Sequence, residues 1–150
     1  MKKLNEEDVS KLKNAIKLQK NDSDEEALSI LWDLYKRNSE NGKVIGFLGL
    51  ILAKTGQRAK AIPYLEKAIT ISPHSELVNM SLYISYAEIE KYDIAFNVIF
   101  EYLKLYPADL YLTTLEELLE GLLEGYGTTY QDKIIFYAKK NKVLIPVELQ

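Results

Sequence analysis

Few residues in this sequence could support catalysis or hold a transition metal. His74 is the only histidine and cysteine is absent, so a transition-metal site would need almost exclusively carboxylate ligands, which is unusual. The missing cysteines also exclude disulfides and thiolate chemistry, and they fit a reducing compartment. Because His74 lies between Pro73 and Ser75, we interpret it as a turn residue rather than as a base or a ligand.

The carboxylates and glycines near the C-terminus form the other patterns that could do chemistry. Glu116, Glu120 and Glu124 recur every four residues, so a helix would place them on one face. Paired carboxylates act as acid and base only in a cleft that separates their pKa values, and we interpret this set as a solvated helix surface. The glycines within 121–127 match no phosphate-binding loop, because no strand precedes them and no Lys-Ser/Thr follows. We predict that the protein is not an enzyme and needs neither metal nor cofactor.

The composition narrows the classes of partner and the compartment. The 150 residues include 19 basic and 22 acidic side chains, which gives a formal net charge of −3. A surface that neutralises many phosphates should be rich in Lys and Arg, so we expect no nucleic-acid partner. No run approaches the roughly 18 apolar residues of a membrane span, and the N-terminus lacks the apolar stretch of a secretory signal. We predict a cytoplasmic protein without membrane insertion.

A 34-residue period sets the elements that would position any functional residue. Three classes of position share this period: alanines, residues that cap helices, and prolines. The members are Ala27, Ala61 and Ala95; Asn41, Ser75 and Asp109; and Pro73 and Pro107. Between each cap and the next alanine, and between that alanine and the next cap, apolar residues follow helical spacing. The period therefore predicts a series of helical hairpins.

This pattern resembles the tetratricopeptide repeat, a helix–turn–helix of 34 residues. The central unit matches the family's signature positions at Ile45, Leu48, Gly49, Leu52, Ala61, Leu65, Ala68 and Pro73. The outer units depart from it: the slot for a small, glycine-like residue holds Tyr83, and the late alanine slot holds Leu34 and Tyr102. The resemblance implies an all-α fold, a right-handed α-solenoid of antiparallel helix pairs with about eight helices.

We expect a single tetratricopeptide-like domain over residues 1–142, followed by an apolar C-terminal tail over 143–150. The expected repeats are 8–41, 42–75 and 76–109, with a diverged terminal hairpin over 110–142. The two helices of that hairpin carry opposite charges, which suits antiparallel neighbours, although an exposed ion pair contributes only about 0.2–1 kcal/mol. The tail either lies across the last helices or occupies a groove of this chain or of a neighbour.

The resemblance also implies that the first helix of each repeat lines a concave surface on which polypeptides dock. Transferring the family's positions to this chain gives a mostly apolar set of predicted partner-binding residues. They are Leu12, Ile16, Lys43, Leu50, Lys54, Leu77, Met80, Ile84, Tyr111 and Leu118. The basic and amide residues of the carboxylate clamp of co-chaperones are missing, because its positions hold Leu12, Ile16, Phe47, Leu77 and Ser81. Docking of chaperone C-termini is therefore not expected.

The leading hypothesis is a non-catalytic protein–protein interaction module, chaperone-like or adaptor-like, that binds a helical or extended apolar segment. One alternative is a bacterial immunity protein or inhibitor that blocks a toxin through its convex or acidic face. Another is a structural unit that forms a homodimer through its terminal helices or its tail. In a further alternative, the apolar residues assigned to the groove are simply core between repeats, or are covered by the tail.

Overall fold

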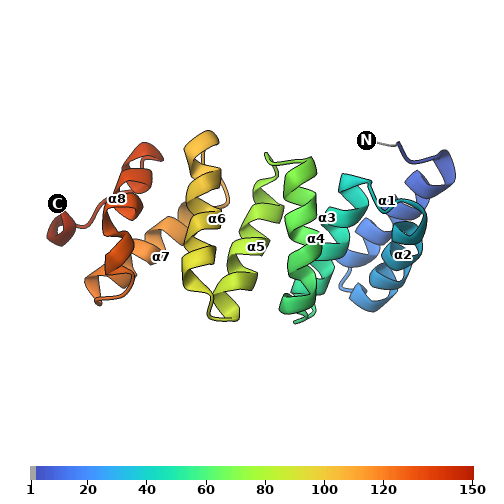
Figure 1. The fold of residues 1–150 in the computed structure, drawn as a ribbon, viewed down its shortest axis with the longest axis horizontal. Coiled ribbons are helices and arrows are strands. Elements are labelled where there is room, and N and C mark those ends of the chain that lie inside the picture. Colours follow the sequence, from blue (N-terminus) through green and yellow to red (C-terminus); the bar gives the residue numbers. More distant parts are fainter. Residues whose placement is uncertain (1–2) are drawn as a thin grey trace.

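A computed structural model describes residues 3–150 as an all-helical protein. Within this part the chain forms eight α-helices and two short 3-10 helices, and no strand. The helices are α1 (Glu6–Lys20), α2 (Asp24–Arg37), α3 (Gly42–Lys54), α4 (Arg58–Ile71), α5 (Glu76–Glu88), α6 (Tyr92–Leu105), α7 (Leu112–Leu123), η1 (Thr128–Tyr130), α8 (Gln131–Lys140) and η2 (Val147–Leu149). Successive hairpins lie side by side from the N-terminus to the C-terminus (Figure 1). No helix of the described residues has the length and apolarity of a membrane span.

The first three hairpins follow the predicted 34-residue period at their helix ends. Helices α1, α3 and α5 end at Lys20, Lys54 and Glu88, and α2, α4 and α6 begin at Asp24, Arg58 and Tyr92. The turn between the helices repeats as well, because Asp22, Gly56 and Glu90 all have positive φ. The residue after each donates its amide to a carbonyl five residues earlier, which closes the end of the first helix. The prediction of an all-α solenoid of repeated hairpins is confirmed.

The two helices of the central hairpin, α3 and α4, lie in close contact at Gly49. A Cβ atom on Gly49 would lie 2.8 Å from Leu65 Cδ2 and 3.2 Å from the Leu65 backbone nitrogen. Only a residue without a side chain fits between these backbones. In the third hairpin the equivalent position holds Tyr83, which packs against residues of both core clusters described next.

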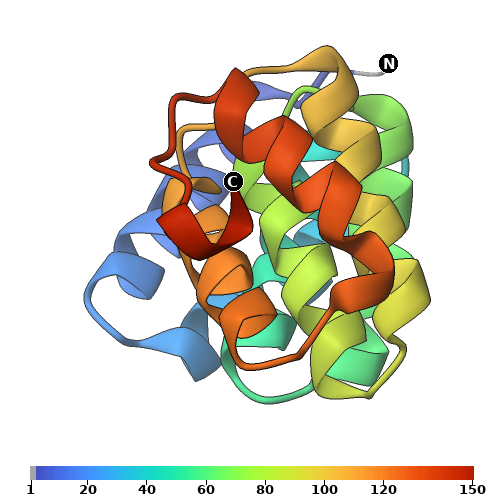
Figure 2. The same ribbon diagram turned by 90° about the vertical axis from the view of Figure 1, so that its left-hand side faces the viewer.

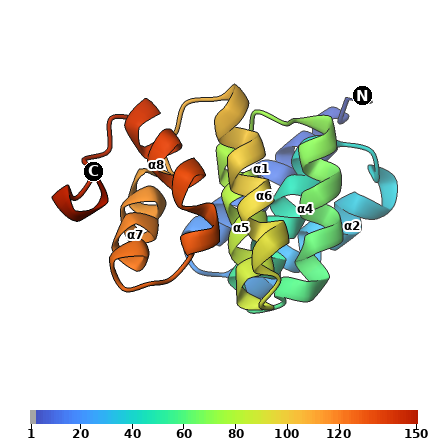
Figure 3. The same cartoon turned by 60° about the vertical axis from the view of Figure 1, so that its left-hand side comes forward.

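The core consists of two clusters of buried apolar side chains that meet along α6. The first cluster extends from Leu12 in α1 to Ala95 at the start of α6. The second begins with Ile99 in α6 and continues through α7 and α8 to Ile145 in the tail. Figure 3 shows α7 and α8 as a pair beside α5 and α6. The terminal hairpin therefore covers the second half of α6.

The terminal hairpin departs from the period by two residues. The helix caps Asn41 and Ser75 are 34 residues apart, but the next cap is Tyr111, 36 residues after Ser75. The prediction of Asp109 as a cap is wrong, because α7 begins only at Leu112 and Asp109 lies in the preceding turn, which Glu76 holds. Its carboxylate accepts hydrogen bonds from the amides of Asp109, Leu110 and Tyr111 at 2.8, 2.6 and 2.9 Å.

The expected charge pairing within the terminal hairpin is not formed. No ion pair among the described residues joins α7 to α8. Instead, Lys133 lies 5.8 Å from the ring centre of Phe100, and Lys140 lies 5.9 Å from that of Tyr137. Apolar packing of Ile134 and Ala138 against the second cluster holds α8 in place.

The C-terminal tail lies against the last helices with some of its apolar residues turned inward and others outward. Ile145 is buried, and Val143 and Leu149 pack against the second cluster. Leu144 and Val147 point outward and remain 89% and 79% exposed. Figure 2 looks along the array from its C-terminal end, where α8 and the tail are nearest the viewer.

We predict opposite effects for alanine at two glycines of α3. Gly49→Ala should lower the free energy of unfolding by about 1–2 kcal/mol, because overpacking against Leu65 outweighs the gain in helix propensity. Gly46→Ala should raise it by about 0.5–1 kcal/mol, since its Cβ would meet Val78 and Ala68 at an ordinary 3.6 and 3.8 Å. Urea denaturation measures both. A Gly49→Ala variant as stable as the unmodified chain would contradict the close approach.

A second prediction concerns Asp8, a buried carboxylate that ties α1 to the end of α2. Arg37 Nη2 and Asn38 Nδ2 donate to it at 2.7 and 2.9 Å, and these bonds hold the pKa of Asp8 below its ordinary value. Its contribution to stability is therefore complete above the unfolded pKa of about 3.9 and is lost as pH falls through the lower folded pKa.

Asp8→Asn should therefore be less stable than the unmodified chain at neutral pH, and the two should converge in acid. Thermal unfolding followed by circular dichroism between neutral pH and pH 3 measures the difference. Asp33→Asn serves as the control, because Asp33 also bonds to Arg37 but its side chain is 53% exposed, so its loss should be smaller. A difference between Asp8→Asn and the unmodified chain that does not shrink in acid would refute the assignment.

Candidate partner-binding face

Three of the predicted partner-binding residues occupy equivalent positions on the first helix of each of the first three hairpins. Ile16 on α1, Leu50 on α3 and Ile84 on α5 are spaced by 34 residues, and each is partly exposed. Because the helix ends keep the same register, these side chains recur at one height of the array. We call these three residues the first-helix stripe.

A shallow hollow of about 260 Å³ lies beside the stripe, between α3 and α5. Three predicted residues line it: Lys43, Leu50 and Leu77. Leu77 is 49% exposed, and Gly46 leaves the floor open because it has no side chain. Of the other predicted residues, Met80 is partly buried and packs against the second core cluster. The hollow combines an apolar floor with one lysine at its edge.

Lys54, at the end of α3, forms ion pairs with the preceding hairpin. Its Nζ lies 3.2 Å from Asp22 Oδ1 and 3.1 Å from Asp24 Oδ1. The hydrogen bonds to Asp24 and then Asp22 raise the pKa of Lys54. Lys54 therefore joins the turn of the first hairpin to the second hairpin. Lys43 remains as an exposed cation beside the hollow.

The structure places three other predicted residues away from the first-helix stripe. Leu12 is part of the core. Tyr111 is fully buried and donates a hydrogen bond to Asn79 Oδ1 at 2.5 Å; burial raises its pKa above the ordinary value. Because α7 starts two residues late, Tyr111 corresponds to the caps Asn41 and Ser75, not to Lys43 and Leu77. By the same shift, Leu118 corresponds to the core residue Leu48.

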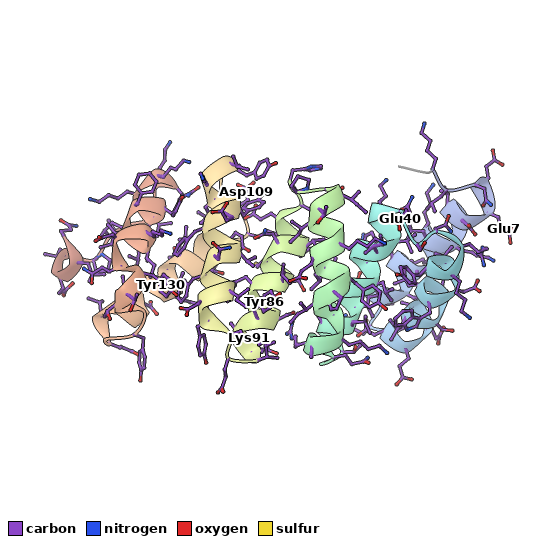
Figure 4. All side chains as sticks on the ribbon, viewed as in Figure 1. Glu7, Glu40, Tyr86, Lys91, Asp109 and Tyr130 are labelled. Carbon is purple, nitrogen blue, oxygen red and sulfur yellow. The ribbon has the colours of Figure 1, made fainter. Side chains whose placement is uncertain are left out.

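Sequence reasoning missed a second, larger hollow of about 450 Å³ between the third hairpin and the terminal hairpin. Aromatic rings from α5, α6 and the segment after α7 line it, together with Leu118 and Glu117. Phe96 and Tyr130 stack at 4.2 Å between ring centres. Tyr130, labelled in Figure 4, lies on the side of the terminal hairpin that faces α6. The sequence signal was Tyr83, a bulky residue in a slot for a small one.

The residues first considered for catalysis lie at the surface. His74 is exposed in the turn before α5, at the edge of the smaller hollow. Glu116, Glu120 and Glu124 are exposed along α7. Across residues 3–150 no three His, Asp or Glu side chains gather in an arrangement that could hold a metal ion.

Comparison with known proteins identifies the central hairpin. A family model for the tetratricopeptide repeat matches residues 43–75, which cover α3, α4 and the turn to α5. No curated protein matches the chain. The matched segment contains the close contact at Gly49, and the hairpins on either side share its helix ends and turns. Residues 43–75 thus match a tetratricopeptide repeat, and the described chain consists of three helical hairpins in 34-residue register followed by a diverged terminal hairpin.

Proposed function

We propose that the chain is a non-catalytic protein–protein interaction module whose first-helix face binds a helical or extended apolar segment of another polypeptide. The observation that carries the proposal is the first-helix stripe of Ile16, Leu50 and Ile84, together with the hollow beside it. Three partly exposed apolar side chains at one height of a rigid array form a continuous contact for a segment with its own apolar side. The tetratricopeptide repeat at 43–75 supports this role.

The size of the face favours reversible binding. Complete burial of a Leu or Ile side chain contributes about 1.5–3 kcal/mol, and the stripe residues are already partly covered by their own helices. The three stripe residues and Leu77 together could therefore contribute roughly 3–6 kcal/mol, before contacts of the partner's backbone are counted. Because association itself costs several kcal/mol, an affinity near the micromolar range is expected. Such an affinity suits an adaptor or a chaperone that releases its client.

The proposal predicts that a charge in the stripe abolishes partner capture. Leu50→Glu and Ile84→Glu should each weaken binding at least about tenfold, because a carboxylate would be desolvated at the centre of the contact. Immobilised protein is exposed to an extract of the source cells, and captured polypeptides are identified and quantified by mass spectrometry.

Ile94→Glu is the matched control, because Ile94 is an exposed isoleucine on α6, the second helix of the third hairpin, and so lies outside the proposed face. Circular dichroism should show that all three variants retain the helical fold. Capture that is equal for Leu50→Glu, Ile84→Glu and the unmodified chain would refute the proposed face. If Ile94→Glu alone loses capture, the partner instead contacts the face formed by the second helix of each hairpin.

The outward residues of the tail favour self-association as a second candidate. Leu144 and Val147 are among the most exposed large apolar side chains of the described chain. They lie on the end of the array, where a second copy could cover them, as the ends of solenoids require. The inward residues Ile145 and Leu149 already fix the tail to the last helices.

A double variant tests this candidate without disturbing the inward side of the tail. Leu144→Glu with Val147→Glu should convert a dimer to a monomer, because two carboxylates would replace the apolar contact. Light scattering coupled to size-exclusion chromatography measures the mass. An unmodified chain that is already monomeric at high concentration would rule this candidate out.

A further inference from the structure

The larger hollow, here called the aromatic pocket, has an unusual lining. Five aromatic residues line it: Tyr83 from α5, Tyr92 and Phe96 from α6, and Tyr126 and Tyr130 from the segment between α7 and α8. Its volume of about 450 Å³ falls in the range of sites that take a specific ligand group. Tyr92 and Tyr126 are exposed, so the pocket opens to solvent on that side.

The pocket results from two departures from the repeat. Tyr83 occupies the position at which Gly49 brings the helices of the central hairpin together, so a ring stands where the preceding hairpin has a close contact. The two-residue shift of α7 then prevents this helix from repeating the position of α3 and α5. Gly127, with φ of +69°, turns the chain beneath the rings, and a Cβ there would lie 3.8 Å from Phe96 Cζ.

Glu117 is the one charged residue that lines the pocket, and no Lys, Arg or His lines it. Glu117 and Tyr83 both line the pocket, and burial first, and then the negative charge of Glu117, raise the pKa of Tyr83. Tyr130 donates its hydroxyl to Asp93, so a second carboxylate lies behind the aromatic wall. No ion pair of Glu117 is present among the described residues.

We propose that the aromatic pocket receives a basic side chain, arginine or lysine, from the bound polypeptide, with Glu117 as its counter-charge. The negative faces of aromatic rings attract a cation, and a guanidinium stacks on them. The aliphatic stem of such a side chain covers the apolar floor while its charged head reaches the carboxylate. This inference rests on the proposed function, because it takes the ligand to be part of a polypeptide.

A purely apolar side chain fits the pocket less well. It would cover the rings but would also withdraw water from Glu117 without supplying a hydrogen-bond donor, which is unfavourable for a carboxylate. The surrounding charge favours a basic ligand as well, since α7 carries Glu116, Glu117 and Glu120 and no basic residue. The partner segment is therefore expected to combine apolar residues for the first-helix stripe with a basic residue for the pocket.

Small probes test the pocket without the natural partner. The full chain is titrated with N-acetyl-arginine methylamide, with the neutral citrulline analogue of similar shape, and with the apolar norleucine analogue. Backbone amide signals of Gly121 and Gly127, both in the lining, report binding in two-dimensional NMR spectra. The arginine probe should saturate these signals at millimolar concentration and bind about three- to tenfold more tightly than either neutral probe.

Glu117→Gln should remove the preference for arginine, and Glu116→Gln is the matched control that should retain it, because Glu116 lies on the same helix outside the pocket. Binding of norleucine as tight as that of arginine would overturn the proposal and identify an apolar pocket. Absence of saturation at Gly121 and Gly127 with every probe would also overturn it. Since the titration uses no partner, its failure is distinct from unchanged capture by Leu50→Glu, which would instead refute the proposed function.

Discussion

The contact between Gly49 and Leu65 is the constraint on which the regular part of the array depends. With the Cβ position of Gly49 only 2.8 Å from a Leu65 side-chain atom, the backbones of α3 and α4 lie as close as a glycine allows. This approach lets Ile45, Leu48, Leu52 and Leu65 become completely buried. A single hairpin cannot bury both of its apolar sides, so the well-packed central hairpin needs a neighbour on each side. The first and third hairpins meet this need and hold the stripe residues at a common height.

Most charged contacts in this region tie elements together rather than form a reactive site. Lys54 connects the second hairpin to the turn of the first, and Arg58 Nε lies 2.8 Å from Glu88 of the third. Lys67 reaches Glu40 at 2.8 Å between α4 and the loop before α3. Exposed pairs of this kind add little stability individually, but they engage these cations with carboxylates of neighbouring elements.

The terminal hairpin shows how a small change in spacing creates a different surface. The turn before α7 is two residues longer than its counterparts, and Glu76 of the preceding hairpin accepts from three backbone amides of this turn. The shift buries Tyr111 against Asn79 and leaves Leu118 partly buried, in the lining of the aromatic pocket. The first-helix stripe consequently ends at Ile84, and the aromatic pocket lies beyond it.

The sequence alone determined the period, the helices and the type of repeat. The residues that carry this information act on the neighbouring backbone or through one close contact between helices; they are Ala27, Ala61, Ala95, Asn41 and Ser75. It also predicted that Ile16, Leu50 and Ile84 take equivalent positions, since a constant spacing carries a position from one hairpin to the next. It could not place Tyr111 and Leu118, because α7 begins two residues late, after a turn that bonds to Glu76 of a different hairpin. Nor could it reveal the aromatic pocket, whose rings come from three separate segments. Only tertiary packing decided that Tyr83, Tyr130 and Glu117 share one surface.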